Sequence, residues 1–333
     1  MRMHTFIIAE AGANHNRDLN IAYSLIDKAK EAGADAVKFQ TYSSETLYAK
    51  NTPRIAGYDN INQLIKDIEL PREWQSKLKH RCDLIGIEFM STPFDENAIE
   101  ELVQLGAKRL KVAGFESTDM RFLRRVALTK LPLIVSVGIG SDEQMTQKIV
   151  ETCREYGCGD LTLLHCNNAY PTPVEDINLL TIPKIHDDFE VKVGLSDHTE
   201  STLTPALAVA LGAKVIEKHF TLARNMKGPD HPFAMEPHEL KTMVANIRYA
   251  EKGLTLKTGA YTNSELIFKK AGRSLVVTKD LRAGDTLTED NTTTKRPFLD
   301  DGIHASEYYE FLGKRLKYPV PADTPLKLGQ VQL

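Results

Sequence analysis

Side chains that can do chemistry recur at the ends of eight short apolar runs in this 333-residue chain. Carboxylates, imidazoles, lysines and hydroxyls are the groups with which enzymes move protons, bind metals and hold anions. The polar ends are Glu10; Lys38 with Gln40; Ser91 with Thr92; Lys111; Ser136; His165; Ser196 with His198; and Glu217 with His219. If the runs are strands of one sheet, these groups form a single candidate active site.

His198 and His219 are the candidate metal ligands. They follow the last two apolar runs, so neighbouring strand ends would bring both imidazoles within reach of one ion. Imidazole suits borderline divalent cations such as Mn²⁺, Fe²⁺, Co²⁺ and Zn²⁺. A two-histidine site also keeps positions open for a Lewis-acid role. Two structural histidines are the alternative, and their place on adjacent strands disfavours it.

The other strand ends suit an anion and a base. Lys38 and Lys111, with hydroxyls such as those of Thr92 and Ser136, predict a site for phosphate or carboxylate. One lysine alone could form a Schiff base, but two lysines beside a histidine pair favour anion binding. Each hydroxyl could also be a helix cap. Glu10 would serve as a general base or position water; otherwise it is a structural acid paired with a lysine.

Four further residues are candidates that depend on loops. Asn168 and Tyr170 flank a stiff Tyr-Pro-x-Pro turn, which would fix both side chains but needs no function. Asp230 lies in a Gly-Pro-Asp-His turn after the eighth run, where an acid is usually solvated. Arg296 is a surface arginine unless its segment folds over the site.

The alternation of apolar runs with helical patterns predicts an α/β fold, a (β/α)8 TIM barrel with its site at the carboxyl ends of the strands. The helical patterns span residues 19–32, 96–105, 141–156, with Ser141 as the N-cap, 202–211 and 237–253. Residues 43–67 interrupt the alternation of strands and helices after the second apolar run. Long insertions at such places usually act as lids or contact substrates.

The pattern changes near residue 255, which predicts two domains. Residues 1–255 would form the barrel, 256–272 a polar linker, and 273–333 a small, loop-rich, mainly β domain. A domain of that size is marginally stable alone, so we expect it to pack on its own barrel or on a partner. Its Thr292–Thr294 run also raises the alternative of a non-catalytic carbohydrate- or ice-binding protein.

The composition and net charge of the chain limit the classes of partner that we expect. A net charge of −3 implies no broad cationic surface, which argues against nucleic acid. No apolar stretch approaches the ~20 residues that span a membrane, and none resembles a signal peptide. We therefore expect a cytoplasmic protein with no membrane or nucleic-acid partner. The four cysteines form no CxxC pair, so we interpret them as reduced structural thiols.

Several segments together resemble the sialic acid synthases, the bacterial synthases of N-acetylneuraminate, legionaminate and pseudaminate. The tail, from RSLVVTKDLRAGDTLTEDN through KRP to LGKRL, resembles the antifreeze-like (SAF) domain of that family. The barrel segments are IIAEAGANHN, AVKFQTY, STPFD, LKVAGFE, LLHCNNAYPTP, VGLSDHT, IEKHFT and GPDH. The resemblance covers almost the whole chain.

The resemblance implies a reaction between phosphoenolpyruvate and an N-acylated hexose. A C–C bond would form, and phosphate would leave by C–O cleavage. The expected sugar is N-acetylmannosamine, which gives N-acetylneuraminate. The alternative is a diacetamido-trideoxyhexose, which gives N,N'-diacetyllegionaminate or pseudaminate. A Schiff-base barrel lyase remains a remoter alternative.

The resemblance also implies roles for the candidate residues. His198 and His219 would bind Mn²⁺, with Mg²⁺ or Co²⁺ possible, and Glu10 would act near the attacking water. Gln40 and Asp230 would contact the sugar and metal-bound water, and Arg296 would hold the N-acyl group across a domain-swapped homodimer. The residues expected to hold phosphoenolpyruvate are Lys38, Thr92, Lys111, Ser136, Asn168, Tyr170 and Ser196.

The chain departs from the family pattern at four places, one of which is Ser136-Val137-Gly138-Ile139 instead of the usual STGM. Arg17 replaces a frequent glycine, and Gly114 replaces a serine that usually touches phosphoenolpyruvate. The loop after Pro297 is longer and lacks its first glycine, which bears on how Arg296 approaches the site. The Gly-Pro-Asp-His turn favours N-acetylneuraminate or legionaminate as product, and Gly-Phe-Glu, more weakly, favours pseudaminate.

Overall fold

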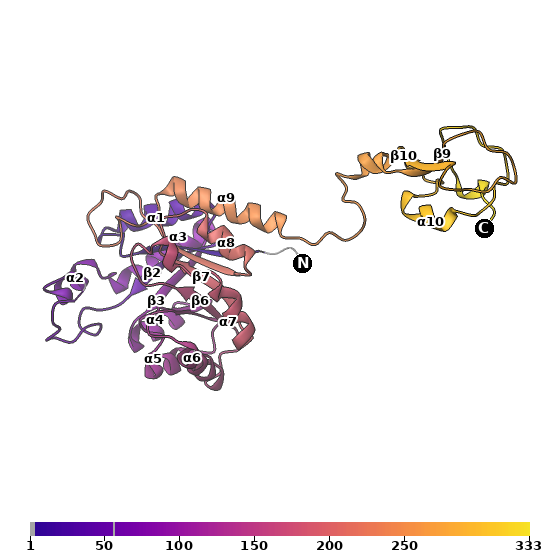
Figure 1. The fold of residues 1–333 in the computed structure, drawn as a ribbon. Coiled ribbons are helices and arrows are strands. Elements are labelled where there is room, and N and C mark those ends of the chain that lie inside the picture. Colours follow the sequence, from indigo (N-terminus) through magenta and orange to yellow (C-terminus); the bar gives the residue numbers. More distant parts are fainter. Residues whose placement is uncertain (1–3, 56) are drawn as a thin grey trace. The chain divides into compact units, whose positions relative to one another are not determined.

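Eight parallel strands form a nearly closed barrel in the computed structural model, which describes residues 4–55 and 57–333 (Figure 1). Positions 1–3 and 56 of the predicted barrel domain and its insertion lie outside the described residues. The strands pair in the order β3-β2-β1-β8-β7-β6-β5-β4, and β3 also lies beside β4. They are β1 (Phe6–Gly12), β2 (Ala36–Thr41), β3 (Glu88–Pro93), β4 (Leu110–Val112), β5 (Leu133–Val137), β6 (Leu161–Cys166), β7 (Lys192–Asp197) and β8 (Val215–His219).

At least one helix follows each strand, and the helices surround the barrel (Figure 1). The predicted (β/α)8 fold is therefore confirmed. The helices are α1 (Leu19–Ala32), α2 (Ile61–Ile68), α3 (Gln75–Ile85), α4 (Glu96–Gln104), α5 (Met120–Ala127), α6 (Glu143–Glu155), α7 (Thr181–Phe189), α8 (Thr204–Ala210) and α9 (Pro237–Gly253).

Capping residues set the helix ends. In α1 the Asp18 carboxylate accepts hydrogen bonds from the first-turn amides, and Gly33 ends the helix with a left-handed φ of 88°. The prediction for residues 19–32 is thus confirmed. The predicted N-cap of α6 is wrong, because Asp142 rather than Ser141 caps the helix by accepting from the Met145 amide. Ser141 lies one residue earlier, in a turn closed by its own amide.

The strand alternation builds two layers inside the barrel. Alternate residues of a strand point to the same side, so each inward apolar residue is followed two positions later by an inward polar one. Ile8 precedes Glu10, Ala36 precedes Lys38, Met90 precedes Thr92, Ile134 precedes Ser136 and Val215 precedes Glu217. The apolar members form one buried cluster. This cluster closes the floor beneath the polar residues, which therefore lie at the carboxyl ends of the strands.

The insertion after β2 carries a helix of its own. Residues 43–55 and 57–60 contain turns and bends but no helix or strand, and α2 follows at the end of the insertion. Ile61 and Ile65 of α2 pack on Tyr42 in a small separate cluster. The role of the insertion as a lid stays a prediction.

Contacts divide the chain into two units, Met1–Thr255 and Leu256–Leu333. The second unit is a small antiparallel sheet of β9 (Ser274–Val277), β10 (Thr292–Lys295) and β11 (Thr324–Pro325), with a short helix, α10 (Tyr308–Phe311). Its mainly β character is confirmed. The Thr292 side chain is buried and donates to the Thr288 carbonyl, so Thr292–Thr294 present no flat exposed array.

Two composition-based expectations concern features of the chain as a whole. The cysteines are all buried free thiols, as predicted; they are Cys82, Cys153, Cys158 and Cys166. Among the helices of the described residues, none has both the length and the apolar character that crossing a membrane requires.

Candidate active site

Lys38 and Glu10 form a buried ion pair at the mouth of the barrel. The Lys38 Nζ lies 2.8 Å from Glu10 Oε2 and donates to Thr92 Oγ1 at 2.7 Å. The Gln40 amide donates to the other carboxylate oxygen of Glu10 at 2.8 Å. β1 and β2 are paired with Glu10 beside Lys38, so the sheet register itself brings the two charges together.

Glu217, a strand-end candidate to which the sequence assigned no role, completes a network of charges. Its carboxylate lies 3.6 Å from Lys38 Nζ and 3.5 Å from Lys111 Nζ, and accepts a hydrogen bond from Ser196 Oγ at 3.2 Å. The signal was available in the alternation of β8. Glu217 and His219 share the inward side, while Lys218 points the other way and pairs with Asp197.

Lys111 of β4 is held at the mouth by hydrogen bonds. Its Nζ donates to Ser136 Oγ at 2.8 Å and to the Val112 carbonyl at 3.1 Å. The side chain is almost fully buried. The two lysines therefore face one small cavity from different strands, with Glu217 between them.

Burial and charge shift the titration of this network. Burial raises the pKa of Glu10 to about 7, although Lys38 opposes the shift. Burial also acts to raise the pKa of Glu217, but Lys111 and Lys38 outweigh it and hold that pKa below its usual value. Glu10 can therefore gain or lose a proton near neutral pH, while Glu217 remains an ionised partner of Lys38 and Lys111.

The two candidate metal ligands lie together beside this network. The rings of His198 and His219 have centroids 5.3 Å apart. His198 Nδ1 is 2.6 Å from the Asn167 carbonyl, which leaves its Nε2 available. His219 Nδ1 is buried without a hydrogen-bond partner and lies 3.7 Å from Asp230 Oδ2.

The histidine environment keeps both rings neutral. Burial lowers the pKa of His198, and it lowers that of His219 well below its usual range. Neutral imidazole is the form that binds metals. Within residues 4–55 and 57–333, no group of three or more His, Cys, Asp or Glu side chains is arranged to hold an ion. The histidine pair therefore fits a metal only as part of a ligand set that substrate or water completes.

An aromatic wall borders the histidines. The Tyr170 ring lies 4.2 Å from that of His198, and the Phe233 ring lies 5.3 Å from that of His219, measured between centroids. Burial raises the pKa of Tyr170, so its hydroxyl stays protonated. Tyr170 thus presents a neutral donor at the mouth.

The structure brings most of the predicted site residues to one cavity. Asp230 lies just beyond it, next to His219, and burial raises its pKa to about 6. Arg296 belongs to the second unit, where its side chain is exposed. Gly114, Phe115, Cys166 and Glu217 also line the cavity, although no role was predicted for Phe115, Cys166 or Glu217. The predicted residues that line it are Glu10, Lys38, Gln40, Thr92, Lys111, Ser136, Asn168, Tyr170, Ser196, His198 and His219.

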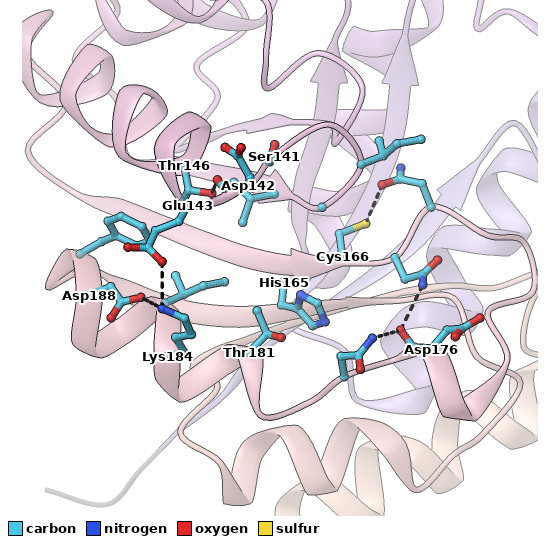
Figure 2. Close-up of a pocket in the computed structure, with 18 of the residues that line it drawn as sticks. Ser141, Asp142, Glu143, Thr146, His165, Cys166, Asp176, Thr181, Lys184 and Asp188 are labelled. Carbon is cyan, nitrogen blue, oxygen red and sulfur yellow. Dashed lines mark hydrogen bonds and ion pairs between the residues drawn. The ribbon is translucent and has the colours of Figure 1, made fainter.

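A larger pocket of about 630 Å³ adjoins the mouth (Figure 2). It lies among α6, α7 and the loops that precede them. Lys184 of α7 reaches Glu143 of α6 at 3.3 Å and also pairs with Asp188. Cys166 and Asn168 line both this pocket and the mouth, so their side chains form part of the wall between the two cavities.

Comparison with known proteins identifies the family. Residues 25–258 match the model of the NeuB family, and residues 272–332 match the SAF domain. The chain belongs to the NeuB family. The family match confirms the predicted class of enzyme, a phosphoenolpyruvate-dependent nonulosonic acid synthase.

Named relatives refine the comparison. The chain is 40% identical to the N,N'-diacetyllegionaminic acid synthase of Legionella pneumophila, over 97% of this chain and 94% of the relative. It is 38% identical to the pseudaminic acid synthase of Helicobacter pylori, over 98% and 97% of the two chains. A crystal structure of N-acetylneuraminic acid synthetase from Leptospira borgpetersenii matches with a TM-score of 0.73 and 34% identity, over 80% of this chain and 90% of that one.

Glu217→Gln removes the charge that balances both buried lysines. We expect it to lower the free energy of unfolding by about 3 kcal/mol, because a buried cation left without its partner is costly. Urea denaturation measures this loss. Glu31→Gln is the matched control, since Glu31 pairs with Lys28 on an exposed helix surface, and we expect a loss below about 1 kcal/mol. Equal losses in the two variants would show that Glu217 does not balance the lysines.

Proposed function

We propose that this chain condenses phosphoenolpyruvate with a diacetamido-trideoxyhexose to give a legionaminate- or pseudaminate-type nonulosonic acid and phosphate. The observation that carries the proposal is the mouth itself, where two lysines, two buried carboxylates and a histidine pair share one cavity. N-acetylmannosamine, the sugar first expected, becomes the alternative. The legionaminate and pseudaminate synthases match this chain at 38–40% identity over nearly its whole length.

Phosphoenolpyruvate would bind between the lysines. Its phosphate and carboxylate need cationic and hydroxyl donors from more than one direction. Lys38 and Lys111 supply the charge from β2 and β4. Thr92, Ser136 and Ser196 surround them with hydroxyls, and Asn168 and Tyr170 add an amide and a phenol at the rim.

His198 and His219 would hold the divalent cation, for which Mn²⁺ is the expected metal. Burial favours the neutral form of both imidazoles, and the buried Nδ1 of His219 has no hydrogen-bond partner, which fits a ligand role. When bound, the cation supplies Lewis-acid polarisation of the hexose carbonyl. Asp230, beside His219, would contact the sugar.

Glu10 would act as the general base that accepts a proton from the attacking water. C3 of phosphoenolpyruvate bonds to the hexose carbonyl carbon, whose C=O π bond opens and takes a proton to become a hydroxyl. Water adds to C2, and the C2–O bond to phosphate breaks, which leaves a ketone at C2 and releases phosphate. A pKa of about 7 leaves Glu10 partly ionised at neutral pH, so that it can accept the proton that water releases. The hydrogen bond from Gln40 orients its carboxylate for that step.

Arg296 would complete the site from a second copy of the chain. It is exposed in the second unit, and that unit has only a small hydrophobic core of its own. A domain-swapped homodimer, in which Arg296 of each chain holds the N-acyl group in the other chain's barrel, would account for the retention of so small a domain.

A phosphate-release screen tests the reaction and its sugar. With phosphoenolpyruvate and Mn²⁺, we expect the diacetamido-trideoxyhexoses to release phosphate faster than N-acetylmannosamine or its 6-phosphate. EDTA should abolish the release, and added Mn²⁺ should restore it. Release with none of these sugars would contradict the proposal. Borohydride trapping of pyruvate on Lys38 or Lys111, insensitive to EDTA, would favour the Schiff-base alternative.

Subunit mixing tests the shared site. Arg296→Ala and His219→Ala should each lose activity, while a refolded mixture of the two variants should regain part of it. A heterodimer would hold one barrel with His219 that receives an intact Arg296. If the mixture turned over no faster than the average of the two single variants, the domain-swapped dimer would be contradicted.

A further inference from the structure

The Asn168 side chain is held on several sides at the rim of the mouth. It follows β6 and lines both the mouth and the adjoining pocket. An amide has one acceptor oxygen and two N–H donors. Which of these faces the cavity depends on what the neighbouring groups take, so the contacts of Asn168 decide what it can offer a ligand.

Cys166 occupies the acceptor side of this amide. Its thiol donates to Asn168 Oδ1 with a sulfur–oxygen distance of 3.6 Å (Figure 2). The thiol is buried, and burial raises its pKa to about 11, so the proton stays on sulfur and the donor is permanent. Burial dominates the pKa of Tyr170, but Asn168 opposes that shift, as an N–H donor to the phenol oxygen would. With the amide oxygen facing Cys166 and one N–H facing Tyr170, the second N–H of the amide is left for a ligand.

Gly114 makes the room that the amide fills. A Cβ at position 114 would lie 2.9 Å from Asn168 Oδ1, closer than real Cβ atoms approach, and a tight 3.1 Å from Nδ2. The three atoms nearest to that Cβ all belong to the Asn168 side chain. The backbone of Gly114 does not have a positive φ, so a larger residue would act through the amide rather than through backbone strain.

We propose that Gly114 and Cys166 are positioning residues, which together fix the Asn168 amide so that an N–H faces the anion bound at the barrel mouth. The inference rests on the proposed function for the identity of that anion, phosphoenolpyruvate. In this chain a side chain at position 114 would therefore push the Asn168 amide out of its place, and the thiol of Cys166 serves as a hydrogen-bond donor.

A double-mutant cycle on Gly114 and Asn168 tests the proposal. Gly114→Ala should raise the Kd and KM for phosphoenolpyruvate about tenfold, since it displaces a hydrogen bond to a charged ligand, and should change kcat much less. In the Asn168→Ala background, the same Gly114→Ala change should have no further effect, because the short side chain leaves room. Additive losses would overturn the coupling.

Matched variants separate positioning from general damage. Gly159→Ala adds a Cβ at a glycine with nothing within 4 Å and should leave Kd and KM unchanged. Cys166→Ser, which keeps a donor, should bind phosphoenolpyruvate more tightly than Cys166→Ala. Equal binding by the two Cys166 variants would remove the thiol from the account.

The outcome can be told apart from failure of the proposed function. If the wild-type protein bound no phosphoenolpyruvate, the proposed function and the ligand part of this inference would both fail. The same cycle read in urea midpoints would then still decide whether Gly114 positions Asn168. Non-additive changes in the urea midpoint would support the contact between Gly114 and Asn168, and additive changes would overturn it.

Discussion

The mouth of the barrel depends on neutralising the positive charges of two buried lysines, Lys38 and Lys111. The inward apolar layer lies beneath Lys38 and Lys111, and both side chains are almost fully buried at the mouth. An isolated buried charge costs several kcal/mol or more. Glu10 and Glu217 offset that cost, and the result is a cavity whose charges are paired but can be rearranged around an anion.

The functional layer follows from the same strand geometry that builds the core. Two residues after an inward apolar side chain of the floor, the same strand points a polar side chain into the mouth. The register of the strands therefore positions both the core and the site. This places the site on rigid elements, with loops adding the rim. Tyr170, Asn168 and Asp230 come from such loops, and each is held there by contacts with residues of the barrel.

Strand-end patterns were enough to predict the barrel and most residues of its mouth, because parallel strands bring their carboxyl ends to one edge. Glu217 was a strand-end candidate, but its role was not predicted because its partners, Lys38 and Lys111, are distant in sequence and only the closed barrel places it beside both. The relation of Gly114 to Asn168 depends on an approach of two loops, which no spacing in the sequence encodes. Ser141 and Asp142 are adjacent residues that can both cap a helix, and the sequence pattern did not distinguish them. In the structure Asp142 caps α6.

The central claim is that the buried lysines at the mouth hold phosphoenolpyruvate, and calorimetric titration of that ligand tests it most directly. Lys111→Met and Lys218→Met each remove a buried lysine of β4 or β8, but only Lys111 lines the mouth. The account predicts that Lys111→Met loses phosphoenolpyruvate binding while Lys218→Met, if folded by circular dichroism, keeps it. Binding retained by Lys111→Met at wild-type affinity would contradict the account.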